Sequence, residues 1–129
     1  MSPVSELEAA RRWLEAYGRA WEARDPGAAA ELFTEDASYA WGPFEEPLRG
    51  RDAIRRRWDE ATAVQRNVRF ASEVLGVVDA GAVARWWCAF DAGEGHIELE
   101  GIFLVSLTVD ELCSDFREWW NERASTPND

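Results

Sequence analysis

The chain has 129 residues, of which 47% are hydrophobic and 30% charged, so it can bury one core and keep a well-solvated surface. The formal net charge of −11 argues against nucleic acid as the main partner, because an acidic protein repels phosphate backbones. The sequence has no apolar run of the roughly 18 residues that span a membrane and no secretory signal at its start. We therefore expect a cytoplasmic protein with no membrane partner.

The first predicted element is a long amphipathic helix over residues 5–24. Ser5 and Glu8 have the spacing of a capping box at its start. Apolar residues then recur at helical spacing, at Leu7, Ala10, Trp13, Leu14, Tyr17, Ala20 and Trp21. This stripe predicts the face of the helix that packs on the core.

Shorter elements are predicted between residues 25 and 65. Asp25 followed by Pro26 is typical of a helix start. We predict, in order, a helix over residues 26–33, a polar turn over 34–36, a strand over 37–41, a loop over 42–47 and a helix after Gly50. The buried stripe of that last helix is expected at Ile54, Trp58 and Ala61, with its arginines mostly off the stripe.

After residue 65 the pattern changes to strands. Four are predicted, over residues 68–78, 82–90, 97–109 and 113–120, and the turn residues between them are typical of hairpins. Helices followed by a mostly antiparallel meander indicate the α+β class, with the helices on one face of the sheet. We expect one domain over residues 1–124 and a frayed polar tail over 125–129.

The sequence offers little for metal or cofactor chemistry. Cys88 and Cys113 lack metal-ligand spacing and are expected to be reduced thiols. A single histidine, His96, leaves no histidine-based zinc cluster. We expect neither a metal nor a cofactor.

A set of residues spread along the chain matches a known family. They are Tyr17 and Trp21, Asp25, Leu32-Phe33, Asp36-Ala37, Pro47, Gly50-Arg51, Ile54 and the closing Arg117-Glu118-Trp119-Trp120-Asn121. With them the chain resembles the nuclear transport factor 2-like superfamily and, within it, the SnoaL-like branch that includes polyketide cyclases. Ketosteroid isomerases and limonene epoxide hydrolases are relatives of that branch.

The resemblance implies a cystatin-like α+β roll, in which three N-terminal helices pack on a curved sheet and leave a cone-shaped pocket. Such a pocket suits a small hydrophobic ligand. The resemblance also implies a homodimer through the outer face of the sheet.

Two positions depart from the isomerases of this superfamily. Trp41 stands where those enzymes keep an aspartate base, and Phe103 stands near their second acid. An indole cannot act as a general base, so we reject steroid isomerisation by that mechanism. The Asp-Arg-Asp triad of the epoxide hydrolases is not recognisable either.

Glu118 is the best remaining acid. Side chains alternate along a strand, so Ser114, Phe116, Glu118 and Trp120 share one face. The resemblance puts Trp120 in the pocket, and a carboxyl beside aromatic rings should have a raised pKa. Glu118 is then a catalytic acid or base, a polar anchor for a ligand, or the partner of an arginine at the pocket rim.

Tyr17 and His96 are weaker catalytic candidates. Tyr17 matches the position of a tyrosine that binds a developing oxyanion in the isomerases, although it also reads as a core tyrosine. If Phe103 points inward, alternation turns His96, Glu98 and Glu100 outward. His96 becomes a proton-transfer partner for Glu118 only if a bulge shifts that register.

The eight tryptophans cannot all fill one face of a core. The pairs Trp86-Trp87 and Trp119-Trp120 should each put one ring on each side of the sheet. The residues expected to contact a ligand are Trp41, Trp58, Trp86, Phe103, Phe116 and Trp120. In a competing interpretation, the large rings of Trp41, Trp58 and Trp120 fill the cone and leave no cavity.

Three functions remain open. The first is a small cofactor-free enzyme, a cyclase, isomerase or hydrolase, that acts on an apolar carbonyl-bearing metabolite. The second is a non-catalytic binder of a small hydrophobic ligand, and the third is a dimerising accessory domain with a filled core. The arginines gathered over residues 51–69 indicate either a solvated, polarised surface or a place for an anionic ligand.

Overall fold

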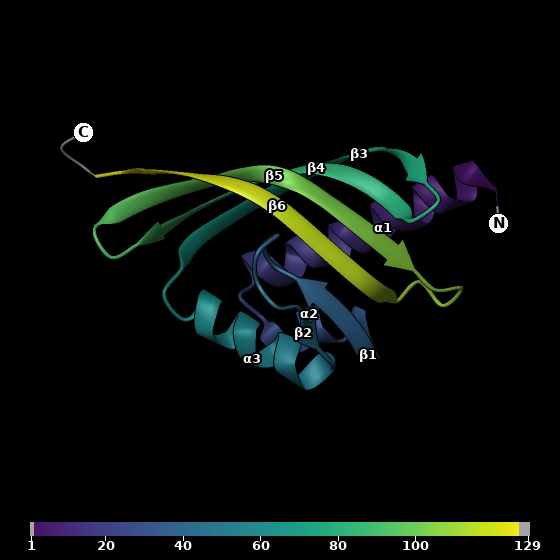
Figure 1. The fold of residues 1–129 in the computed structure, drawn as a ribbon. Coiled ribbons are helices and arrows are strands. Elements are labelled where there is room, and N and C mark those ends of the chain that lie inside the picture. Colours follow the sequence, from purple (N-terminus) through teal and green to yellow (C-terminus); the bar gives the residue numbers. More distant parts are fainter. Residues whose placement is uncertain (1, 127–129) are drawn as a thin grey trace.

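Three helices and six strands make up residues 2–126, the part of the chain that the computed structural model describes (Figure 1). In chain order they are α1 (Pro3–Glu22), α2 (Pro26–Ala30), β1 (Phe33–Ala40), β2 (Leu48–Arg49), α3 (Arg51–Thr62), β3 (Arg66–Val78), β4 (Gly81–Ala92), β5 (Gly95–Leu107) and β6 (Cys113–Ser125).

The strands form one sheet in the order β2-β1-β6-β5-β4-β3. Every neighbouring pair is antiparallel except β1 and β6, which run parallel. Figure 1 shows the long strands β3–β6 curving over the helices, which all lie on one side of the sheet. The predicted α+β class, with a curved and mostly antiparallel sheet, is confirmed.

Helix α1 starts earlier than the predicted capping box. Its N-cap is Ser2, whose hydroxyl accepts a hydrogen bond from the Ser5 backbone N–H at 3.2 Å. The apolar stripe is as expected, with Trp13, Leu14 and Tyr17 each at most 3% exposed. Ser2 makes the better cap because it lies directly before a proline, which favours the first helical position.

Strands β1 and β6 are both longer than predicted. Residues 34–36, predicted as a turn, belong to β1, because buried Phe33 already pairs with Cys113 of β6. A register shift between Phe33 and Ser38 accommodates the polar residues between them. Strand β6 includes Ser125, which pairs with His96 of β5 and was predicted to begin the tail. Residues 127–129 of that tail lie outside the described residues.

Aromatic rings fill the core between α1 and the sheet. The Trp86 and Phe103 rings stack with centroids 4.7 Å apart and an interplanar angle of 5°. Tyr17 packs between Phe103 and Phe116, with ring centroids 5.4 Å from each. These contacts hold α1 against the inner face of the sheet and so fix the position of the Tyr17 ring.

Two core tryptophans make a matched test of one hydrogen bond. Trp21 Nε1 donates to Gln65 Oε1 at 2.8 Å, whereas the buried Trp86 Nε1 has no partner within residues 2–126. Trp21→Phe and Trp86→Phe remove similar ring area, but only the first leaves the buried Gln65 amide without its donor. We therefore expect Trp21→Phe to lower the free energy of unfolding by about 1–3 kcal/mol more than Trp86→Phe. Urea unfolding at pH 7 measures both; equal losses would contradict the expectation.

Candidate active site

A hollow of about 200 Å³ lies between α1, α3 and the inner face of the sheet. Most of its wall is aromatic, contributed by Tyr17, Trp21, Tyr39, Trp41, Trp58, Trp86, Phe90 and Trp120. Its polar residues are Arg57, Thr62, Gln65, Glu118 and Glu122. An apolar hollow that holds a few polar groups is the usual form of a small-molecule site.

Glu118 of β6 faces this hollow, as strand alternation predicts. Burial raises the pKa of its carboxyl from 4.5 to about 8, because desolvation penalises the charged form. The positive charge of Arg57 and a hydrogen bond from Tyr39 lower the pKa, but by less. The Glu118 residue is half-buried, because it borders the hollow.

Two tyrosine hydroxyls adjoin this carboxyl. The Tyr17 and Tyr39 oxygens are 3.0 Å apart and share a hydrogen bond in the buried interior. Burial raises the pKa of both phenols well above the ordinary value, so both stay protonated. Because Tyr39 also acts on Glu118, the two hydroxyls and the carboxyl form one connected polar group.

Sequence reasoning missed Tyr39 and Arg57 as residues of this hollow. Alternation along β1 puts Tyr39 on the same face as Trp41, so the predicted position of Trp41 already implied it. Arg57 lies three residues after Ile54 on α3 and therefore near the buried stripe of that helix. Its guanidinium carbon lies 4.3 Å from the centroid of the Trp41 ring, a cation–π contact at the hollow.

The residues predicted to contact a ligand divide into two groups. Trp41, Trp58, Trp86 and Trp120 line the hollow. Phe103 and Phe116 do not: both are 0% exposed and belong to the core beneath the Tyr17 ring. Inward alternation does not distinguish a pocket wall from the layer below it, and contact of Phe103 and Phe116 with a ligand stays a prediction.

The tryptophan pairs divide between the two faces of the sheet as expected. Trp86 is buried on the inner face, while Trp87 lies on the outer face with the Arg85 guanidinium 4.4 Å from its ring centroid. Trp120 borders the hollow and donates from Nε1 to the Trp41 carbonyl at 3.0 Å, which fixes the rim. Trp41, Trp58 and Trp120 therefore narrow the cone without filling it.

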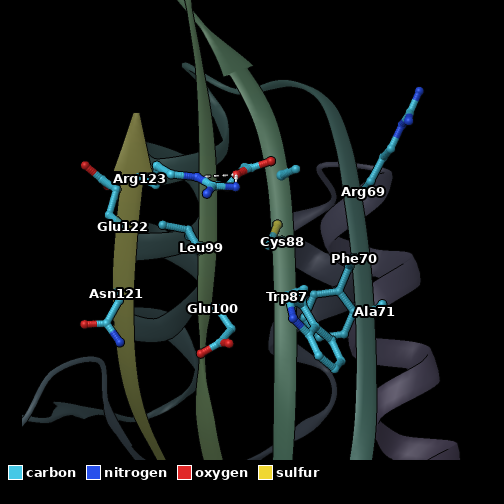
Figure 2. A pocket seen from close by; sticks show the side chains of 12 residues that line it. Arg69, Phe70, Ala71, Trp87, Cys88, Leu99, Glu100, Asn121, Glu122 and Arg123 are labelled. Atoms are coloured by element: carbon cyan, nitrogen blue, oxygen red, sulfur yellow. Dashed lines mark hydrogen bonds and ion pairs between the residues drawn. The ribbon is translucent and has the colours of Figure 1, made fainter. Parts of the chain in front are cut away.

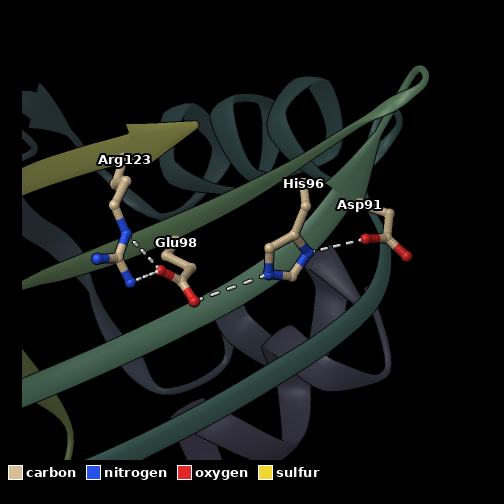
Figure 3. Close-up of polar contacts among 4 residues, drawn as sticks. All are labelled: Asp91, His96, Glu98 and Arg123. Carbon is tan, nitrogen blue, oxygen red and sulfur yellow. Dashed lines mark hydrogen bonds and ion pairs between the residues drawn. The ribbon is translucent and has the colours of Figure 1, made fainter. Parts of the chain in front are cut away.

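His96 lies away from the hollow, on the outer face of the sheet (Figure 3). Its Nδ1 is 2.9 Å from Asp91 Oδ1, and its Nε2 is 3.9 Å from Glu98 Oε1. Strands β4 and β5 pair in continuous register from Ala82 to Ala92, so no bulge turns His96 inward. The register shift that would bring His96 to Glu118 is therefore absent between β4 and β5.

A larger hollow, of about 640 Å³, lies on the outer face of strands β3–β6 (Figure 2). Two of its acids are already paired, Glu98 with Arg123 and Glu100 with Arg85. It lacks the buried carboxyl and hydroxyls that converge in the smaller hollow, so we assign the candidate site to the smaller one. The homodimer expected through this outer face stays a prediction, which sedimentation velocity would test.

Within residues 2–126, no three acidic, cysteine or histidine side chains are grouped so that they could hold a metal ion. The helices of the same region are too short or too polar to cross a membrane.

Helices on one face of a curved sheet, enclosing an aromatic hollow with a half-buried acid, define a protein of the nuclear transport factor 2-like fold. A family model described as a SnoaL-like domain matches residues 10–116. The chain belongs to this SnoaL-like family. No protein of curated function matches it.

Solved structures with the same fold include three enzyme-like proteins. A candidate isomerase from Bacillus subtilis is 21% identical, with a TM-score of 0.78 over 90% of this chain and 88% of that one. SalBIII, an epoxide hydrolase/cyclase-like enzyme of pyran ring formation in salinomycin, is 18% identical, with a TM-score of 0.73 over 86% and 89%. The Δ5-3-ketosteroid isomerase of a Mycobacterium species is 13% identical, with a TM-score of 0.75 over 91% and 98%. At these identities the likeness shows the fold alone.

Proposed function

We propose that this protein is a small cofactor-free enzyme that moves a proton on a small apolar, carbonyl-bearing metabolite, as a cyclase, isomerase or hydrolase does. The observation that carries the proposal is the Glu118 carboxyl, whose pKa of about 8 lets it accept or donate a proton near neutral pH. Isomerases and a cyclase-like enzyme among the structures of the same fold support this class of reaction.

The two tyrosines supply the second part of the proposed mechanism. As Glu118 removes a proton beside a carbonyl, negative charge develops on the carbonyl oxygen. Tyr39 borders the hollow next to Glu118; as the carboxyl takes up the proton, the Tyr39 O–H turns from the carboxyl to that oxygen, while Tyr17, also in the wall, donates to the Tyr39 oxygen. A preorganised phenol in a dry site stabilises such charge far more than water does. Tyr17 thus acts through Tyr39.

The size of the hollow limits the substrate. Its volume of about 200 Å³ is below the roughly 300 Å³ at the lower end of ordinary ligand pockets. The part of the substrate that enters the hollow is therefore smaller than a steroid.

Deuterium exchange tests the proposal without knowledge of the product. Small cyclic and aromatic ketones are incubated with the protein in D₂O, and loss of the proton next to the carbonyl is followed by NMR. Because the base is the ionised form of Glu118, kcat/KM for exchange should rise with pH and level off above a midpoint near 8. A midpoint near 4.5, the ordinary value for glutamate, would contradict the assignment.

The same assay separates the second candidate, a non-catalytic binder of a small hydrophobic ligand. The aromatic wall of the hollow favours such a binder equally well. Ketones that quench tryptophan fluorescence but show no accelerated exchange would favour binding without catalysis.

A further inference from the structure

We propose that Arg57 determines specificity at this hollow by binding a carboxylate, so that the natural ligand is a small ring compound that carries a carboxylic acid. The inference rests on the proposed function only in placing the ligand in the same hollow.

Arg57 makes a cation–π contact at the hollow but no ion pair within residues 2–126. It is the only basic residue among those that line the hollow. Its guanidinium lies over the Trp41 ring at 4.3 Å, and within residues 2–126 no carboxylate lies within 4.0 Å of it. By contrast, the Arg51 guanidinium of the same helix is used structurally, because it donates twice to the Phe33 carbonyl.

The two acids of the hollow, Glu118 and Glu122, make no ion pair with Arg57 within residues 2–126. Burial also raises the pKa of Glu118, which keeps that carboxyl from fully compensating the guanidinium charge near neutral pH. A planar guanidinium presents five N–H donors in a fork that matches a carboxylate, and it stays charged at every physiological pH. A ligand carboxylate would supply the missing counter-charge and two charge-assisted hydrogen bonds.

The aromatic wall defines the rest of the ligand. Trp41, Trp58 and Trp120 line the hollow together with Arg57, so an apolar ring bound there would pack against indole side chains. The volume of about 200 Å³ suits one ring with a short side chain rather than several fused rings. An aromatic or alicyclic acid with a carbonyl group combines these requirements.

Binding measurements test the inference independently of turnover. Benzoate, cinnamate and 4-oxocyclohexanecarboxylate are titrated at pH 7 against the corresponding amides, with tryptophan fluorescence as the readout. The wild-type protein should bind carboxylates more tightly than amides. Arg57→Gln should weaken carboxylate binding by about 10- to 100-fold and leave amide binding unchanged, because only the charged ligand loses its partner.

Arg56→Gln is the matched control, since Arg56 is exposed on the same helix and should keep the full preference. Arg57→Lys retains the positive charge but not the paired N–H donors of the guanidinium. It should therefore keep part of the preference for carboxylates over amides. Because ligand binding is measured without turnover, absence of exchange activity in the wild-type protein would refute the enzyme proposal alone. The inference is overturned if no carboxylate binds, if amides bind equally well, or if Arg57→Gln behaves like Arg56→Gln.

Discussion

Replacement of Glu118 by glutamine is expected to lower the rate of proton exchange by about 10²- to 10⁴-fold, the usual contribution of a positioned acid or base. Glutamine has nearly the same shape and can keep a hydrogen bond with Tyr39, but its amide cannot take up or release the proton. The loss should therefore appear in kcat, with little change in substrate affinity.

Glu122→Gln is the matched control for this result. Glu122 lies four residues further along the same strand, borders the same hollow and has an exposed side chain. Its variant should keep nearly wild-type exchange. Equal rates for wild type and Glu118→Gln, on any substrate that the protein turns over, would remove Glu118 from the mechanism.

The same Glu118→Gln substitution is expected to stabilise the fold in alkaline solution. The folded pKa of about 8 lies above the unfolded value of 4.5, so folding favours the protonated carboxyl. The stabilising contribution of the protonated group is complete below pH 4.5 and is lost as pH rises through 8. A shift of this size corresponds to roughly 5 kcal/mol, and water in the open hollow should reduce it to about 2–4 kcal/mol at pH 9.

Urea unfolding at two pH values measures this effect. At pH 4.5 the wild type and Glu118→Gln should have similar free energies of unfolding, because glutamine resembles the protonated acid. At pH 9 the variant should be the more stable protein, while Glu122→Gln should follow the wild type at both pH values. A variant that is less stable than wild type at pH 9 would mean that the ionised carboxylate is well accommodated, contrary to the desolvation described here.

The order of helices and strands was readable from the sequence because each element has a clear period. The residues at which the elements begin and end were harder to predict. The polar run at residues 34–36 reads as a turn, yet it lies in β1 because Phe33 and Ser38 pair with β6, a contact between distant parts of the chain. Likewise, Ser2 outcompetes Ser5 as the cap of α1, a choice that depends on the proline between them.

The candidate site was predicted in part. Alternation along β6 predicted that Glu118 faces the hollow, and it does, since the register of that strand is regular from Asp115 onward. Depth could not be predicted in the same way: Phe103 and Trp86 both point inward, but only Trp86 reaches the hollow. Arg57 was missed because a charged residue on a helix is usually solvated. Its place at the hollow is marked by its contact with the Trp41 ring, which the helix pattern does not show.

Direct titration of the Glu118 carboxyl is the decisive measurement for the proposed site. The protein is labelled with ¹³C at the glutamate carboxyls, and the Glu118 signal is assigned by its loss in Glu118→Gln. Its chemical shift should change with a midpoint near pH 8, because burial beside the aromatic wall disfavours the charged form. A midpoint near pH 4.5 would show that the carboxyl is solvated and ionised, and that it is not the proton-transfer group proposed here.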